Sequence, residues 1–171
     1  MIDQKIFNLI HSLSGHYKIL DLLGIFLAQY LPYLLIIGFA ILLLLEKNWR
    51  RRLYQLFLVS LSVLLARGLA VEVIRFFYQK QRPYIALAFR PLIDLDFSYA
   101  FPSGHAAIFF ALAMATFFFR KSWSYYFFAG AFLISLARVY VGVHWPLDVL
   151  GGAVVGIISA FVVWKILPQI R

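Results

Sequence analysis

The sequence contains no cysteine, which excludes disulfide bonds, thiolate-ligated zinc and cysteine nucleophiles, and leaves no thiol to indicate a redox compartment. Charged residues are also scarce, at 13% of the chain against about a quarter in an average soluble domain. Hydrophobic residues make up 64% of the chain, and the mean hydropathy is +0.87. This balance excludes a soluble globular domain and predicts an integral membrane protein.

Acidic residues are few, with seven Asp and Glu against 16 Lys and Arg, so the formal net charge is +9. On a soluble protein such an excess would suggest a nucleic-acid partner. Here the basic residues lie between apolar stretches, which is typical of topology control and of attraction to anionic lipids. We therefore expect membrane lipids and no nucleic acid as partners, and the sequence carries no signal for an oligomeric state.

Five apolar stretches are separated by polar connections, at residues 19–45, 53–74, 106–119, 123–137 and 147–167. With its flanking residues, each stretch can cross about 30 Å of hydrocarbon as a helix. The third and fourth are short, so we expect their ends to lie in polar protein surroundings. The sequence predicts an all-α, integral membrane helical bundle with about five transmembrane helices, forming one domain over residues 1–171.

The first 16 residues contain no long apolar core, so no cleavable signal peptide is expected. Apolar residues nevertheless recur there at helical spacing: Ile2, Ile6, Leu9, Ile10 and Leu13. This pattern predicts a short amphipathic interfacial helix that lies on the bilayer surface before the first span.

Orientation is predicted from basic residues in short connections. Residues 46–52 carry four positive charges and residues 120–122 carry two, so both connections, with Lys165 and Arg171, should be cytoplasmic. The loop at residues 75–101 then lies outside together with the N-terminus. That loop is itself basic, and a binding role for its arginines would explain the exception.

Three short segments combine polar residues that an apolar chain has no packing reason to hold. They lie at residues 75–83, 101–105 and 137–148. Because successive transmembrane helices alternate in direction, all three segments fall at the same membrane face.

The residue types in these segments suit phosphate chemistry. Arginines at a water-excluded face offer forked donors and permanent positive charge to phosphate oxygens. Ser103 and Gly104, just before a helix, supply free backbone N–H groups, to which the helix dipole adds positive potential. If one helix includes His144 and Asp148 they share a face, and an aspartate that fixes one ring nitrogen leaves the other as a nucleophile. His105 would face the same site and could give a proton to a leaving oxygen.

Each feature also has an ordinary structural explanation. A histidine in a loop is commonly a surface residue, and Pro-Ser-Gly before a helix is commonly a turn and cap. Arginines that flank spans commonly anchor helices at headgroup level, and an aspartate in a first turn commonly contacts the helix dipole. The convergence of three such segments at one face favours a shared functional role.

The three segments resemble the signature of the type 2 phosphatidic acid phosphatases (PAP2), which is Lys-x6-Arg-Pro, Pro-Ser-Gly-His and Ser-Arg-x5-His-x3-Asp. The spacing is kept throughout, and the second motif matches fully. Arg75 stands where the family usually has lysine, which keeps the charge with a different reach. Ala137 replaces the usual serine and removes one hydroxyl.

This resemblance implies a role for each matching residue. His144 would attack phosphorus and become a phosphohistidine, Asp148 would orient it, and His105 would protonate the leaving group. The phosphoryl oxygens would be held by Arg75, Arg82, Arg138, Ser103 and the backbone of Gly104. Family members need no metal or other cofactor, which agrees with the lack of a carboxylate cluster near the motifs. We interpret the one close pair, Asp94 and Asp96, as solvated loop residues.

Within the family, the chain length and the N-terminal stretch are similar to the bacitracin-resistance type of undecaprenyl-diphosphatase. That similarity implies hydrolysis of undecaprenyl diphosphate, in cell-wall synthesis, at the extracytoplasmic side of a bacterial inner membrane. Other substrates remain open: phosphatidylglycerol phosphate, phosphatidic acid, or a lipid acceptor in a phosphotransferase. A catalytically dead lipid-binding or transport protein is the alternative from another class.

Two charged residues, Arg67 and Glu72, lie within the second apolar stretch, and intramembrane charges are functional candidates. Glu72 is three residues before Arg75 and is expected to support it, with direct substrate contact as the alternative. Arg67 would either extend to the membrane interface or line a polar cavity.

Overall fold

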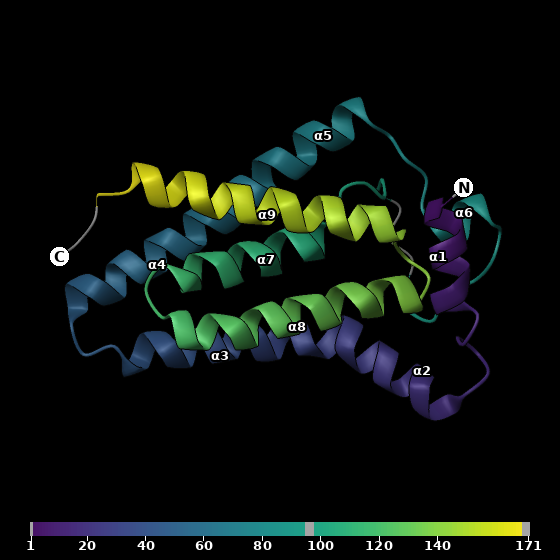
Figure 1. Cartoon of the computed structure of the whole chain (residues 1–171), viewed down its shortest axis with the longest axis horizontal. Coiled ribbons are helices and arrows are strands. Elements are labelled where there is room, and N and C mark those ends of the chain that lie inside the picture. The colour runs from purple at the N-terminus through teal and green to yellow at the C-terminus, as the bar shows by residue number, and fades with distance from the viewer. Residues whose placement is uncertain (1, 95–97, 169–171) are drawn as a thin grey trace.

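The computed structural model describes residues 2–94 and 98–168, which form helices and connecting segments with no β-strand among them (Figure 1). Asp96 and Arg171 lie outside the described residues. The helices are α1 (Ile2–His11), α2 (Lys18–Ile25), α3 (Leu31–Leu45), α4 (Trp49–Val63), α5 (Val71–Phe77), α6 (Pro83–Ala86), α7 (Gly104–Phe117), α8 (Lys121–Tyr140) and α9 (Pro146–Ile166). Two π-helical segments, η1 (Phe26–Tyr30) and η2 (Leu64–Ala70), join α2 to α3 and α4 to α5.

The predicted all-α membrane fold is confirmed, and each predicted apolar stretch corresponds to one helical run. Three runs, Lys18–Leu45, Trp49–Phe77 and Pro146–Ile166, are long and apolar enough to cross a membrane. Helix α7 has only 14 residues, about 21 Å at 1.5 Å per residue, which is less than the thickness of a hydrocarbon core. Most residues of α7 are buried, so this short helix is enclosed by protein along its length.

Helix α7 is the centre of the bundle, between α8 and α9 (Figure 1). Gly152 and Gly156 of α9 face it, and a Cβ atom added at either glycine would lie 2.4 Å from the backbone oxygen of Ser103 or Ala107. Helices in membranes associate largely through such close packing of small residues, because lipid is as apolar as the helices. The contact fixes the start of α7 against the start of α9.

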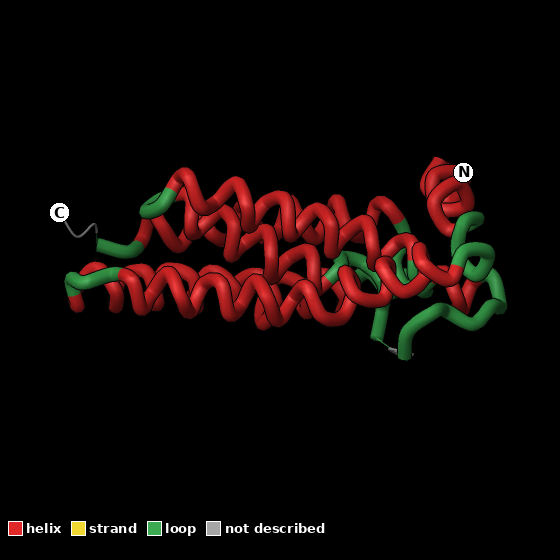
Figure 2. Tube along the Cα trace, turned by 90° about the horizontal axis from the view of Figure 1, so that it is seen from below, coloured by secondary structure: helices red, strands yellow, loops and turns green. Residues whose placement is uncertain are grey.

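Helix α1 crosses one end of the bundle (Figures 1 and 2). Its Phe7 is 1% exposed, and the ring centroid lies 5.0 Å from that of Trp145. His11 Nδ1 lies 2.8 Å from the carbonyl oxygen of Tyr140. The outward face carries exposed apolar side chains, such as Leu9. The predicted helix is therefore present, and it packs on the turn between α8 and α9 as well as offering an apolar face to a membrane interface.

The two basic connections lie together at the opposite end of the bundle. Glu46, which follows α3, and Arg120, which precedes α8, are 3.6 Å apart between Oε2 and Nη2. In Figure 1 this end is on the left, whereas α1 and the α8–α9 turn are on the right. The basic connections are therefore a full helix length away from the three motif segments.

Gly156→Ala is expected to lower the thermal unfolding midpoint in detergent, because its methyl group would meet Ala107 O at 2.4 Å and Ala111 N at 2.8 Å. Overpacking against an immovable backbone costs about 1–3 kcal/mol. Gly68→Ala in η2 is the matched control, since a Cβ atom there meets no atom within 4 Å. Equal midpoints for the two variants would contradict tight packing of α7 on α9.

Candidate active site

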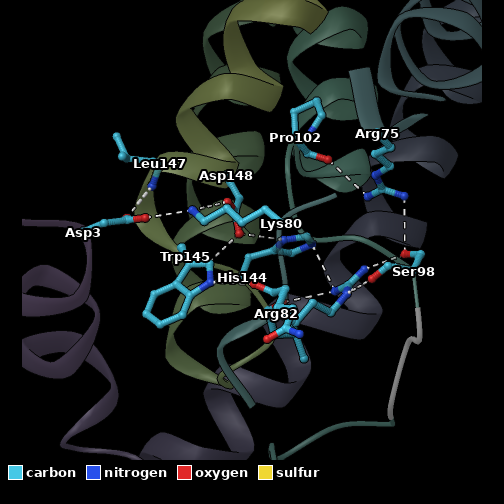
Figure 3. A network of polar contacts seen from close by, with 12 residues as sticks. Asp3, Arg75, Lys80, Arg82, Ser98, Pro102, His144, Trp145, Leu147 and Asp148 are labelled. Carbon is cyan, nitrogen blue, oxygen red and sulfur yellow. Dashed lines mark hydrogen bonds and ion pairs between the residues drawn. The ribbon is translucent and has the colours of Figure 1, made fainter. Parts of the chain in front are cut away.

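The three motif segments meet at the end of the bundle that α1 crosses (Figure 3). Arg75 lies in the last turn of α5, and Arg82 directly precedes α6. The turn between α8 and α9 carries His144 and depends on Gly142, which has φ +90. A side chain at Gly142 would be strained by that φ and would collide with the ring of Phe89.

Arg82 is 1% exposed and is held in one orientation by backbone and side-chain acceptors. Its Nε donates to the carbonyl oxygen of Ser98 at 2.8 Å, and its Nη2 donates to the Ser98 hydroxyl at 2.8 Å. Nη1 donates to the carbonyl oxygen of Val143 at 3.1 Å and lies 3.4 Å from Nε2 of His144. The guanidinium therefore stands directly beside one ring nitrogen of His144 (Figure 3).

Arg75 is also buried, at 5% exposure, and shares an acceptor with Arg82. Its Nη1 donates to the Ser98 hydroxyl at 3.3 Å, and its Nη2 donates to the carbonyl oxygen of Pro102 at 3.1 Å. Ser98 thus links the two arginines. Sequence reasoning recognised Ser98 only as a loop residue, because its position in the fold is set by contacts distant in sequence.

His144 and Asp148 are brought together, with 3.6 Å between Nδ1 and Oδ2, and both are almost fully buried. Helix α9 begins at Pro146, so it includes Asp148 but not His144, and the two do not share a helical face in the way considered above. Asp148 Oδ2 instead accepts a hydrogen bond from the backbone N–H of Trp145 at 2.8 Å. The aspartate caps its own helix and reaches the imidazole from the first turn.

Lys80 and Asp3, which sequence reasoning did not select, complete the surroundings of Asp148 (Figure 3). Lys80 Nζ donates to Asp148 Oδ1 at 2.8 Å and to Asp3 Oδ2 at 2.9 Å. Asp3 Oδ1 accepts from the backbone N–H of Leu147 at 2.9 Å, one of the free donors at the start of α9. Burial disfavours the charged amine, but the hydrogen bonds and negative charges of Asp148 and Asp3 outweigh it and raise the pKa of Lys80. The position of Lys80 inside the first motif was the available signal.

Ser103 is the N-cap residue of α7, but its hydroxyl makes no capping hydrogen bond, so a side-chain cap does not explain this serine. Its hydroxyl is buried and has no hydrogen-bond partner within the described part of the chain. Its backbone N–H donates to the carbonyl oxygen of Asp148 at 2.9 Å. An unpaired buried hydroxyl is costly, so a donor is available here for a bound group.

Gly104 lies against Arg67, since a Cβ atom at Gly104 would be 2.7 Å from Arg67 Nε. Arg67 also pairs with Glu72, whose carboxylate is 4.0 Å from Arg75 Nη1. Arg67 and Glu72, together with Arg75 and Ser98, line a cavity of about 660 Å³. Of the two roles considered for Arg67, lining a polar cavity agrees with its position. Glu72 contacts Arg67 more closely than the Arg75 it was expected to support.

His105 and Arg138 line a second cavity, of about 270 Å³, on the side of the first span. Arg138 is 7% exposed and lies in the last turn of α8, whereas His105 is partly buried in the first turn of α7. All residues selected from the three motifs therefore lie around this end of α7. Among residues 2–94 and 98–168, no group of three His, Asp or Glu is arranged to hold a metal ion.

The arrangement is suited to a single chemical task. A buried imidazole is flanked by a carboxylate at one nitrogen and a guanidinium at the other, with further cationic and hydroxyl donors around it. Such a site can accept a phosphoryl group, since its charges are fixed before the substrate arrives.

Comparison with known proteins identifies the family to which the chain belongs. The family model described as the PAP2 superfamily matches residues 55–171. The Bacillus subtilis (strain 168) protein named undecaprenyl-diphosphatase BcrC is 29% identical over 99% of this chain and 86% of its own length. The Bacillus licheniformis protein named bacitracin transport permease protein BcrC is 29% identical over 96% of this chain and 80% of its own. Relatives named lipid A 4'-phosphatase and phosphatidylglycerophosphatase B also match.

Among solved structures, the crystal structure of Aquifex aeolicus LpxE superposes with a TM-score of 0.79, at 29% identity and 96% coverage of both chains. The family resemblance inferred from the three motifs is thereby confirmed over the greater part of the chain. The chain belongs to the PAP2 superfamily of membrane lipid phosphatases.

Proposed function

We propose that the protein hydrolyses a polyprenyl diphosphate, undecaprenyl diphosphate in particular, to the lipid monophosphate through a phosphohistidine on His144. The observation that carries the mechanism is the position of that imidazole, buried between the Arg82 guanidinium and the Asp148 carboxylate. Support for the substrate comes from the undecaprenyl-diphosphatase of B. subtilis, which aligns with almost the entire chain.

The reaction divides into two displacements. In the first, Nε2 of His144 attacks the terminal phosphorus, the bond to the bridging oxygen breaks, and His105 gives that oxygen a proton. In the second, water attacks the phosphorus of the phosphohistidine while His105 takes a proton from it, and the P–N bond breaks to release phosphate. Both steps balance with the two histidines and one water alone.

The transferring phosphoryl group is stabilised mainly by charge and position. Arg75 and Arg82 of the first motif segment and Arg138 of the third supply permanent positive charge, and each is at most 7% exposed. The Ser103 hydroxyl and the backbone N–H of Gly104 supply neutral donors at the start of α7. Burial strengthens these interactions because water does not screen them.

We assign the site to the extracytoplasmic side of a bacterial plasma membrane. The basic connections at residues 46–52 and 120–122 lie at the end of the bundle opposite the three motifs (Figure 1). Basic connections of this length are retained in the cytoplasm. The chemistry of a carrier lipid that is recycled during cell-wall synthesis is consistent with this side.

A second candidate has the same chemistry on a glycerophospholipid, such as phosphatidylglycerol phosphate or phosphatidic acid. Relatives named phosphatidylglycerophosphatase B and lipid A 4'-phosphatase favour keeping it in the test. A phosphotransferase would differ only in the acceptor of the second step. A dead lipid-binding or transport protein is disfavoured, because the chain keeps His144 within 3.6 Å of Asp148 and buries three arginines at the same end of the bundle.

Lys80 and Asp3 act on this chemistry by positioning. A carboxylate as buried as that of Asp148 needs compensation for its lost hydration. Lys80 supplies it at 2.8 Å and is itself stabilised by Asp3 at 2.9 Å. The N-terminal helix therefore stabilises Lys80 beside the orienting aspartate and helps to hold that aspartate in its place.

The purified protein, with a chelator present, is expected to release phosphate from undecaprenyl diphosphate at least about tenfold faster than from phosphatidylglycerol phosphate. His144→Ala should abolish release from both, by at least about 10⁴-fold, because the nucleophile is lost. Size-exclusion elution and thermal midpoint in detergent serve as folding controls for the variant. The parent, but not the variant, should incorporate an acid-labile radioactive phosphoryl label.

Preference for the glycerolipid would replace the proposed substrate and keep the mechanism. Turnover or labelling of His144→Ala near the parent level would refute the phosphohistidine. No release from either lipid would restore the dead-site alternative.

The rate is expected to follow a bell-shaped curve against pH, because the reaction needs a neutral His144 and a protonated His105. The measurement is kcat/KM between about pH 5 and about pH 9 in one detergent. His105→Asn should lose the alkaline limb along with most of the rate. A flat parent profile over that interval would count against the two-histidine assignment.

Asp3→Asn is expected to lower the free energy of unfolding by about 1 kcal/mol at neutral pH. Asparagine keeps an oxygen for the Leu147 N–H but removes the charge beside Lys80. Since the pKa of Lys80 is raised on folding, this stabilisation is complete below the ordinary lysine pKa and is lost as pH rises through the raised value. The measurement is unfolding in detergent, at about pH 7 and above about pH 10.4.

A double-mutant cycle isolates the pair. Asp3→Asn and Lys80→Met should show coupling. Asp21→Asn and Lys80→Met should be additive, because Asp21 Oδ1 accepts from Gly15 N and Tyr140 Oη instead. Additivity in the first cycle would disprove the link between α1 and Asp148.

A further inference from the structure

The cavity that holds His105 and Arg138 is lined on its other side by the first membrane-spanning run. Its remaining lining residues are Ala28, Gln29, Tyr30 and Tyr33, and its volume is about 270 Å³. A liquid water occupies about 30 Å³, so the cavity has room for a phosphate group and the atoms next to it. None of these four residues belongs to the three motifs.

Gln29 is a polar residue within this run, and the mechanism above does not use it. It lies in η1, a π-helical segment inside an apolar helix, and such segments often occur at functional sites. Its amide makes no hydrogen bond within the described part of the chain and lines the cavity. A polar side chain within a span normally faces a partner or a pathway, because contact with hydrocarbon is unfavourable.

The geometry of the reaction determines what lies beside His105. The leaving oxygen must be close to His105 to receive its proton. In a diphosphate this oxygen carries a second phosphorus with two non-bridging oxygens that share one negative charge, whereas in a phosphate monoester it carries a carbon atom. Donors in the cavity of His105 would therefore contact the second phosphate when there is one, and a hydrocarbon when there is not.

We propose that Gln29, with the hydroxyl groups of Tyr30 and Tyr33, forms the subsite for the phosphate that stays on the lipid. The inference rests on the proposed function and deepens it, since the first membrane-spanning run would then determine whether the enzyme prefers a lipid diphosphate or a lipid monophosphate. The amide N–H₂ and the phenol O–H groups donate to the non-bridging oxygens, and Arg138 supplies charge.

The larger cavity on the other side of α7 is less suited to this phosphate. It contains the Glu72 carboxylate, which repels a phosphate, and of its two arginines Arg67 pairs with Glu72 while Arg75 is assigned to the transferring phosphoryl group. Its lining residues include neither of the two reacting histidines. The second phosphate is one bond from the leaving oxygen, so it belongs in the cavity that contains His105.

The test uses the full chain in detergent and two probes with one tail, a prenyl diphosphate and the matching prenyl monophosphate. Gln29→Leu is expected to lower kcat/KM for the diphosphate about 10- to 100-fold and to change it for the monophosphate by less than about threefold. Tyr33→Phe should act in the same direction with a smaller effect. Tyr126→Phe is its matched control, because Tyr126 is an exposed tyrosine near the other end of α8.

Product inhibition gives a second measurement, because the inhibition constant of a product does not change when a variant merely folds less well. Prenyl monophosphate should inhibit Gln29→Leu about tenfold more weakly than the parent, whereas inorganic phosphate, which occupies the arginine site, should inhibit both equally. Equal losses on both lipids, or no loss on either, would overturn the subsite. The kcat/KM of the unmodified protein on the two lipids is measured first. If it is higher for the monophosphate, both the proposed function and this subsite are wrong.

Discussion

The burial of the Asp148 carboxylate is the constraint on which this end of the molecule depends. An ionised carboxylate removed from water costs several kcal/mol unless hydrogen bonds and opposite charge replace its hydration. The chain supplies these from the Trp145 N–H and from Lys80 after α5, and Nδ1 of His144 lies 3.6 Å from the same carboxylate. Because Lys80 needs a second anion, Asp3 joins them and brings α1 across the end of the bundle. Contacts around one buried carboxylate thereby connect α1, the segment after α5 and the start of α9.

The start of α7 gives this charge network a rigid boundary. Ser103 donates its backbone N–H to the Asp148 carbonyl oxygen, and Gly152 leaves no space between the two helices. The Ser103 hydroxyl stays unpaired as a result, because the residue is held by its backbone. Phosphoryl transfer relies on donors that are fixed before the substrate binds. Tight helix packing in an apolar solvent is how a bundle of this size keeps them fixed.

Much of this could be predicted from the sequence because apolar length and motif spacing are local signals. The five apolar stretches correspond to the five helical runs, and alternation of the helices was enough to bring the three motifs to one face. The Asp3–Lys80 pair, 77 positions apart, and the Ser98 bridge follow from tertiary contacts that no local pattern encodes. The π-helical turns were also invisible, since their hydrogen bonds change the register without changing the composition. The hypothesis that His144 and Asp148 share a helix did not hold, because Pro146 begins α9 after His144.

Residues 55–171 and the residues before them contribute different parts of the candidate site. The region that matches the PAP2 model, residues 55–171, contains every residue assigned to the transferring phosphoryl group, which is the same in all phosphatases of this chemistry. The residues before it contribute Asp3 to the charge network and Gln29 to the cavity of His105. What differs between one lipid phosphate and another is the leaving part, which in the proposed subsite contacts the first membrane-spanning run. Relatives about 30% identical bear the names of different lipid phosphatases. The proposed separation, with the displacement on residues of the matched region and the contacts to the leaving part before it, would let one reaction serve different lipid substrates.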